Sequence, residues 1–489
     1  MSALGLARQH GRLLRIELRR STMLLILPLV AVLLGFTELR NDLMQAPLWA
    51  VRSTVFGRGT ELPAGIVAGV AAWIASRDGR RHVTDLIETT ARSQWARRLA
   101  AWAALTVWAM LLYAAYVAVV FVVTARQATW GAPIWWPAAV GAAAILACSA
   151  IGYAAGALVP GRFTAPVVAV VALLAPQIGV IALQHDQQWG RVSPVEDSTV
   201  PGSGVFFPFH AGLSVVQLIF LIGVTLLALS AFALPGSGRG LRTNLIAALI
   251  ALVGIVAVGT GLTLANTASS GAEGIVIPAL HHTADDTPLS YVPSCEVTGT
   301  VPICLHPAFA SLLPDLAASL DPVLDQVAGL PGAPVRVTLG PVVPHQQSGD
   351  IINVPVAASG MKGSPPVLYL SPDLLTLPGG ATFDNGLVPG IQQLRLTVAA
   401  TVISTVIGDF QSGTDAQKAV ATALWIDAAP PAEDGRGGVA PSPARLATGS
   451  AALAAAHRFA ALPATSRHGW LAANLTALRQ GQITVAQVP

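Results

Sequence analysis

The residues best suited to chemistry in this chain are two cysteines and three histidines in its second half. Cys295 and Cys304 flank a short loop in "SCEVTGTVPICLHP", and close cysteines of this kind pair as a disulfide in an oxidising compartment. A zinc site using His281, His282 or His306 is the competing interpretation, but the spacing matches no standard ligand pattern. We therefore predict a disulfide and expect His306 to be a loop or capping residue.

Sequence signatures of enzymes are absent. The chain has no H-E-x-x-H motif, no G-x-S-x-G motif and no G-x-x-x-x-G-K-[ST] phosphate loop. Catalysis requires a general base beside a nucleophile, or a cluster of ligands, and the sequence offers neither. We therefore expect no catalytic residue, no metal ligand and no cofactor in this chain, which disfavours a membrane-tethered hydrolase.

The composition is that of a membrane protein. Of the 489 residues, 53% are apolar and only 11% are charged, whereas about a quarter are charged in soluble domains. A bilayer span needs roughly 17 to 25 apolar residues. Candidate windows lie at 21–37, 62–76, 99–124, 137–159, 164–184, 212–234 and 242–265. We predict a polytopic α-helical membrane protein with about seven transmembrane helices.

The arginines orient these spans, because short cytoplasmic loops retain positive charge. With the N-terminus inside, fourteen arginines fall on the inner side: Arg8, Arg12, Arg15, Arg19, Arg20, Arg77, Arg80, Arg81, Arg92, Arg97, Arg98, Arg162, Arg239 and Arg242. Five fall in the outer loops: Arg40, Arg52, Arg58, Arg126 and Arg191. This predicts a cytoplasmic N-terminus in a bacterial cell membrane and, after an odd number of spans, an extracellular C-terminal region.

Residues 1–20 lead into the first span. Arg8, Arg12, Arg15 and Arg19 lie along one side of a predicted helix. Two interpretations stay open: an interfacial helix on the anionic inner leaflet, or positive charge that only sets topology. A cleavable signal peptide is disfavoured, because "GFTELRND" follows the apolar run in place of a small-residue cleavage site.

The region 266–489 has a different composition. It contains 9 basic and 15 acidic residues, against 19 and 10 in residues 1–265. Apolar periodicity predicts helices at 307–328, 388–408, 415–427 and 447–480, and strands at 334–339, 351–357 and 367–370. The segment "APPAEDGRGGVAPSPA" is typical of a surface loop. We predict a soluble exterior α+β domain with its own core.

Residues 76–98 form a polar stretch between the second and third predicted spans. "SRDGRRHVTDLIETTARSQWARRL" carries six arginines and three acidic residues, so it must lie on the cytoplasmic surface. Val83, Leu86 and Ile87 share one helical face, and Glu88 and Arg92 form an oppositely charged pair four residues apart. The pattern predicts a short surface helix, with a solvated topogenic loop as the alternative.

This region resembles a known family of transporters. "RIELRRS" before the first span and "AGVAAWIASRDGRRHVTDLIETTARSQWARRLAAW" resemble the permease subunit of an ATP-binding-cassette exporter of the type-2 class, in its actinobacterial form. The resemblance covers roughly residues 1–234. It implies a coupling helix after span two that docks on a separate ATPase, which binds the ATP, and a second permease chain. The implied coupling residues are Arg80, Arg81, Val83, Asp85, Leu86, Ile87 and Glu88.

The region beyond the six-span core departs from that pattern. Some relatives in this class carry a domain similar to gluzincin aminopeptidases, and "ALWIDAA" at 423–429 faintly resembles their second zinc-binding helix, with Asp427 in place of the glutamate ligand. The preceding "LRLTVAATVISTVIG" contains no histidine or glutamate. The resemblance therefore implies a degenerate domain that binds and does not hydrolyse.

The expected function is transport, and one other interpretation competes with it. ATP hydrolysis in a partner would move the coupling helix and switch the spans between inward-facing and outward-facing arrangements. No ionisable residue falls clearly within a predicted span, which argues against an ion-driven transporter. The rival is a polytopic anchor that presents an exterior ligand-binding or partner-binding domain. Neither interpretation involves nucleic acid.

The topology is testable by cysteine labelling from outside intact cells. Single cysteines placed at Ser412 or Gly437 should react with an impermeant reagent, because the charge asymmetry puts both outside. A cysteine at Thr84 should not react. Labelling of Thr84 would overturn the orientation.

Overall fold

The computed structural model of this chain divides into two compact units. Unit 1 comprises Met1–Val200 and Phe207–Pro288, and unit 2 comprises Pro201–Phe206 and Leu289–Pro489. The composition changes at residue 266, whereas the units divide at residue 288. The structure describes residues 14–80, 94–195, 203–232, 241–271, 274–297, 299–340, 357–359, 367–370, 375, 382–383, 386–387, 390–408, 413–428 and 449–489.

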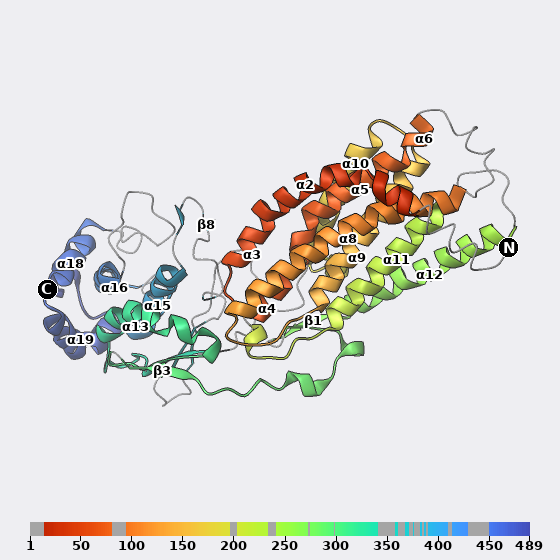
Figure 1. Cartoon of the computed structure of the whole chain (residues 1–489). Coiled ribbons are helices and arrows are strands. Elements are labelled where there is room, and N and C mark those ends of the chain that lie inside the picture. Colours follow the sequence, from red (N-terminus) through yellow and green to blue (C-terminus); the bar gives the residue numbers. More distant parts are fainter. Residues whose placement is uncertain are drawn as a thin grey trace. The chain divides into compact units, whose positions relative to one another are not determined.

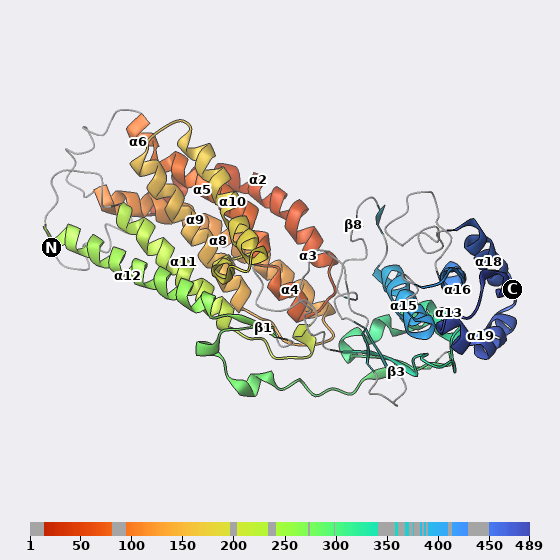
Figure 2. The same cartoon turned by 180° about the vertical axis from the view of Figure 1, so that it is seen from behind.

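Unit 1 is a bundle of helices followed by a small hairpin (Figures 1 and 2). Its longer helices are α2 (Met23–Leu34), α5 (Glu61–Ala75), α8 (Gln94–Gln127), α9 (Trp136–Leu158), α10 (Thr164–Gln184), α11 (Gly212–Ala231) and α12 (Leu241–Asn266). Short elements connect them: η1 (Gly35–Leu39), α3 (Arg40–Met44), α4 (Trp49–Thr54), η2 (Arg58–Thr60), α6 (Arg77–Arg80) and η3 (Gln188–Val192). The strands β1 (Ser269–Gly271) and β2 (Gly274–Val276) are antiparallel.

Six helices of the described chain are long and apolar enough to cross a membrane. They correspond to six of the seven predicted windows, and they suggest a membrane location. The seventh window, 62–76, forms α5, which has 15 residues and is not among these six, so the count of seven stays a prediction. At 1.5 Å per residue α5 is about 22 Å long, shorter than the roughly 30 Å hydrocarbon core.

The short helix α5 is held between α9 and α10 by small residues. Gly152 and Gly156 of α9 leave no room for a side chain, because a Cβ at either position would overlap the backbone of Ala68 or Ala72 of α5. On another side, a Cβ at Gly69 would lie 2.9 Å from the Cβ of Ala169 in α10. Small residues let helix backbones approach closely, and this contact drives helix association in membranes.

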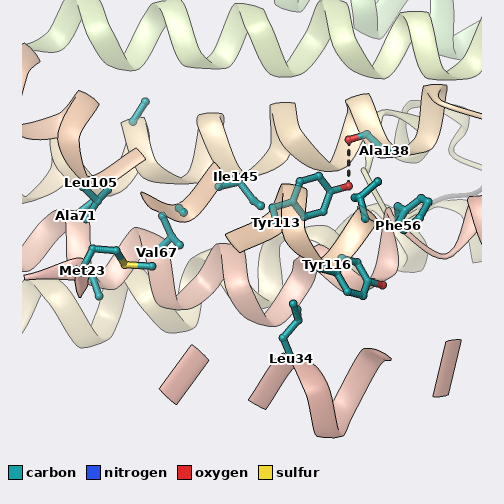
Figure 3. Close-up of a cluster of buried hydrophobic side chains, with 14 of the residues drawn as sticks. Met23, Leu34, Phe56, Val67, Ala71, Leu105, Tyr113, Tyr116, Ala138 and Ile145 are labelled. Atoms are coloured by element: carbon teal, nitrogen blue, oxygen red, sulfur yellow. Dashed lines mark hydrogen bonds between the residues drawn. The ribbon is translucent and has the colours of Figure 1, made fainter. Parts of the chain in front are cut away.

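A core of larger side chains surrounds this contact (Figure 3). Met23 and Leu34 of α2 lie in one buried cluster with Val67 of α5 and Tyr116 of α8. The hydroxyl of Tyr113 donates to the carbonyl oxygen of Ala138 at 3.0 Å, which joins α8 to α9. The buried hydroxyl is thereby satisfied, and α8 is fixed in register with the bundle.

Unit 2 contains a five-stranded mixed sheet with the order β3-β4-β5-β7-β6. The strands are β3 (Ser294–Glu296), β4 (Ile303–Leu305), β5 (Arg336–Leu339), β6 (Ala357–Ser359) and β7 (Val367–Leu370). The pairs β4–β5 and β5–β7 are parallel, and both edge pairs are antiparallel. Cys295 and Cys304 face one another across β3 and β4 and form a disulfide, as the sequence predicts.

The remaining elements of unit 2 are mainly helices. The helices are η4 (Ser203–Val205), η7 (Pro307–Leu312), α13 (Leu313–Asp325), α15 (Gly390–Ile407), α16 (Asp415–Ala428), α18 (Ser450–Ala460), α19 (Ala464–Arg479) and η8 (Val485–Gln487), and a short hairpin is formed by β8 (Thr382–Phe383) and β9 (Gly386–Leu387). The single helix predicted at 447–480 is wrong, because it divides before Pro463, which cannot continue a helix. Most of the predicted strand at 351–357 and all of the predicted loop at 429–444 lie outside the described residues.

The packing of α5 predicts different outcomes for two glycine-to-alanine changes. Gly152→Ala should lower the stability of the folded chain by about 1–3 kcal/mol, because the added methyl group forces α9 away from α5. Gly259→Ala in α12 is the matched control, since nothing lies within 4 Å of its Cβ position. Thermal unfolding in detergent measures both. Equal unfolding temperatures for the two variants would contradict the close contact.

Candidate functional site

The predicted coupling segment begins at the end of α5. The short helix α6 (Arg77–Arg80) follows α5 directly, and the guanidinium of Arg80 lies 3.6 Å from the centre of the Trp73 ring. Arg80 also donates to the carbonyl oxygen of Trp73 at 3.2 Å. These contacts place Arg80 on the last turns of α5. The other predicted coupling residues, Arg81, Val83, Asp85, Leu86, Ile87 and Glu88, lie outside the described residues.

After residue 80 the next described element is α8, which begins at the same end of unit 1. Arg98 donates to the carbonyl oxygen of Phe232 at 3.0 Å, which ties the start of α8 to the end of α11. Nearer the N-terminus, the indole of Trp108 donates to the carbonyl oxygen of Leu18 at 3.0 Å. Residues 14–20 are helical. The segment 81–93 therefore connects two helices that are anchored in the bundle.

The opposite end of unit 1 contains a buried polar network that the sequence did not reveal. Asp42 of α3 is 5% exposed and accepts a hydrogen bond from the hydroxyl of Tyr116 in α8. Arg52 of α4, 3% exposed, donates to the side chain of Gln127 at 2.7 Å and to the carbonyl oxygen of Leu43 at 2.9 Å. Burial of Arg52 lowers its pKa, and its hydrogen bonds satisfy the end of α3.

Two further carboxylates lie in the same part of the bundle. Glu38, in the π-helical segment η1, is half-buried and close enough to Asp42 and Glu61 for electrostatic repulsion. Glu61 accepts a hydrogen bond from the amide of Gln177 in α10 at 2.7 Å. Hydrogen-bonded polar groups of this kind hold membrane helices together.

This network corrects one sequence-based interpretation. The first span extends over Met23–Leu43, beyond the predicted window 21–37, so Glu38 and Asp42 fall within it. The statement that no ionisable residue lies in a span is therefore wrong, and it no longer argues against ion coupling. The four-residue spacing of Glu38 and Asp42 was the available signal; the hydrogen bond of Asp42 with Tyr116 of α8 was not visible in the sequence.

The polar network holds helices together, and its residues do not form a catalytic arrangement. Its members are carboxylates, a tyrosine, an amide and an arginine, which can accept or donate protons but include no activated nucleophile. Among the described residues, no group of three or more histidine, cysteine or acidic side chains could hold a metal ion. We therefore interpret the network as a polar clamp between α3, α4 and α8.

Two of the three histidines considered for zinc have partners of another kind. His306 is the N-cap of η7, and its Nδ1 accepts the amide proton of Ala308 at 3.1 Å, which confirms the predicted capping role. His281 in unit 1 pairs through Nε2 with Asp286 at 2.9 Å. His306 belongs to unit 2.

The two helices of the faint aminopeptidase resemblance are present in unit 2. The helix α15, which lacks a zinc-binding motif, contributes to the core of unit 2 through the buried residues Val398, Val402 and Val406. Asp427 lies in the last turn of α16. The end of α15 is held by Arg479 of α19, which donates to the carbonyl oxygens of Val406 at 2.6 Å and Thr405 at 3.1 Å.

Comparisons with other proteins leave the family open. Neither the models of protein families, nor the curated proteins, nor the solved structures include a match to this chain.

The polar clamp predicts that two nearby arginines differ in importance. Arg52→Ala should destabilise the folded chain by about 2–3 kcal/mol, because Gln127 and the end of α3 lose buried hydrogen bonds. Arg58→Ala is the matched control, since Arg58 lies on the same connection but is exposed. Chemical unfolding in mixed micelles compares them. A smaller effect for Arg52 than for Arg58 would refute the clamp.

The buried His306 predicts a pH dependence of unit 2. Burial lowers the pKa of His306 from 6.5 to about 4, so the unfolded chain binds a proton more readily than the folded chain. The free energy of unfolding of unit 2 is therefore highest above pH 6.5. It decreases as the pH falls towards 4, by up to about 3 kcal/mol.

The measurement for this prediction is hydrogen exchange of β4 and η7 in the intact chain between pH 7 and 4, corrected for intrinsic exchange. His306→Asn keeps a good capping residue and should remove this part of the pH dependence. An unchanged profile in His306→Asn would show that other groups are responsible.

Proposed function

We propose that this chain is the membrane subunit of an ATP-binding-cassette transporter, an exporter driven by a separate ATPase. The observation that carries the proposal is the polar segment 76–98. It follows α5 and precedes α8, and the two ends that flank it are anchored by Arg80 on Trp73 and by Arg98 on Phe232. A helix-rich bundle with an anchored polar segment between two helices is suited to receiving force from a cytoplasmic partner.

The charge distribution supports placing that segment in the cytoplasm. Of the five arginines assigned to the opposite side, Arg52 and Arg191 are buried and hydrogen-bonded within unit 1. They therefore contribute less to the charge that the membrane surface experiences. Fewer than five arginines then offset the fourteen that the sequence assigns to the side of α6, in keeping with a cytoplasmic location of that side.

In the proposed mechanism the helix bundle moves between two states. ATP binding and hydrolysis in the partner would move the segment 76–98, and α5 and α8 would pass that movement into the bundle. Two such chains would form the translocation path. In this proposal α5 crosses the membrane as a seventh span, the N-terminus is cytoplasmic, the membrane is the bacterial cell membrane, and unit 2 is exterior.

A second candidate function has its own supporting observation. Unit 2 has a separate sheet, a disulfide and a buried core that includes Leu316, Leu320 and Phe459, so it is equipped to bind a ligand or partner by itself. In this alternative the membrane helices only anchor a scaffold or receptor, and the arginines of 76–98 only set the topology.

Substitutions in the segment separate the two functions. Replacing both Leu86 and Ile87 by aspartate would put charge on the apolar face of the predicted surface helix, where a partner groove must desolvate it at a cost of several kcal/mol. We expect co-purification of the ATPase and ATP-dependent export to be lost. The matched variant Arg80→Gln/Arg81→Gln removes charge that the proposal places at the rim of the contact, where an exposed pair is worth below about 1 kcal/mol, and should only weaken both.

Membrane insertion should survive in both variants, because Arg77, Arg92, Arg97 and Arg98 remain. If the aspartate variant inserts and keeps its ATPase and its export activity, the segment is a topogenic loop and the transporter proposal fails.

A further inference from the structure

A buried histidine of unit 1 has a ring nitrogen without a partner. His210, which lies two residues before α11, is only 7% exposed. Its Nε2 atom is buried and has no hydrogen-bond partner among the residues that the structure describes. Buried polar atoms are nearly always paired with protein, water or an ion, because an unpaired one costs free energy. The Nε2 atom of His210 is therefore available to a ligand from outside the chain.

A second histidine lies beside His210 in the same unit. The ring centres of His210 and His281 are 5.4 Å apart, and both residues belong to unit 1. The Nε2 atom of His281 lies 2.9 Å from a carboxylate oxygen of Asp286. Because an ionised carboxylate can only accept, this nitrogen carries a proton, and the lone pair of the neutral ring is on Nδ1. Each ring can therefore offer one nitrogen to the same ligand.

The distance between the two rings fits two ligands of one metal ion. A zinc–imidazole bond is about 2.0–2.1 Å long and tetrahedral ligands are about 110° apart, which places the centres of two coordinating rings about 5 Å apart. The observed separation of 5.4 Å is close to this value. A shared ion would therefore leave the distance between the two rings almost unchanged.

Asp286 supplies an outer contact of the kind that metal-binding histidines have. Such a histidine donates its second ring N–H to a carboxylate or a carbonyl, which fixes the ring and makes the coordinating nitrogen more basic. Asp286 has this position relative to His281. The side chain of Asp286 is 43% exposed, whereas that of His281 is 14% exposed. The pair of histidines therefore has a solvent-exposed side from which an ion can enter.

We propose that His210 and His281 bind a divalent transition metal such as Zn²⁺, through Nε2 of His210 and Nδ1 of His281. Imidazole nitrogen suits zinc and copper, whereas magnesium and calcium prefer oxygen ligands. Two histidines do not fill a tetrahedral site, so water or a small ligand would complete the coordination. The ion would connect the segment before α11 to the segment after α12. This site concerns unit 1 alone and does not rest on the proposed function.

Calorimetric titration of zinc chloride into the full chain, in detergent and without a polyhistidine tag, tests the site. We expect saturable binding of Zn²⁺ and no binding of Mg²⁺ at the same concentrations. His210→Phe keeps a buried ring but has no nitrogen, so it should lose this binding. Asp286→Asn should weaken binding by about tenfold or more, because the outer carboxylate is lost. His282→Ala is the matched control, since His282 is the exposed neighbour of His281, and it should bind Zn²⁺ like the wild type.

Thermal unfolding of the same proteins gives a second readout. Excess Zn²⁺ should raise the unfolding temperature of the wild type, because the ion binds the folded chain, and should leave that of His210→Phe unchanged. If His210→Phe does not fold, His281→Phe replaces it, since His281 is less buried.

Three results would overturn the site. The first is a wild-type chain that binds no Zn²⁺, or that binds Mg²⁺ equally well. The second is wild-type affinity for Zn²⁺ in both His210→Phe and His281→Phe, or in the one of them that folds. The third is a loss of binding in His282→Ala as large as the loss in these variants.

Discussion

The close approach of α5 to its two neighbours is the constraint on which unit 1 depends. Nine of the fifteen residues of α5 are buried, and its contacts with α9 and α10 are made through glycine and alanine at backbone distance. Because most of this helix is buried by these contacts, α9 and α10 must lie close against it. The aromatic residues of α8 and the aliphatic residues of α2 then fill the space that remains.

Buried polar side chains supply the hydrogen bonds that close packing of small residues cannot provide. The connection from α3 to α4 would leave helix-end carbonyls unsatisfied, and the buried Arg52 supplies their donors while it also binds Gln127. Tyr116 does the same for the carboxylate of Asp42. Each group is costly in a membrane protein by itself, so their mutual contacts explain why charged residues can sit within the first span. Because Arg52 is buried, its positive charge contributes less to the surface at this end of the bundle.

The sequence predicted what depends on local pattern. Hydropathy located six spans to within a few residues, and the cysteine spacing indicated the disulfide. Properties that depend on distant residues were missed. The first span continues to Leu43, where Asp42 is hydrogen-bonded to Tyr116 of another helix, and the helix at 447–480 breaks before Pro463. The ring contact between Phe206 and His306 was not predictable, because the two residues are a hundred residues apart in the chain.

The functional account requires a partner that supplies energy, since this chain has no phosphate loop. The most direct measurement is isolation of the full chain from its native membrane in a mild detergent, followed by identification of stoichiometric partners and assay of ATP hydrolysis. The account predicts a bound P-loop ATPase whose hydrolysis drives export by the reconstituted complex. Isolation of a chain that performs its cellular function without any nucleotide-hydrolysing partner would contradict it.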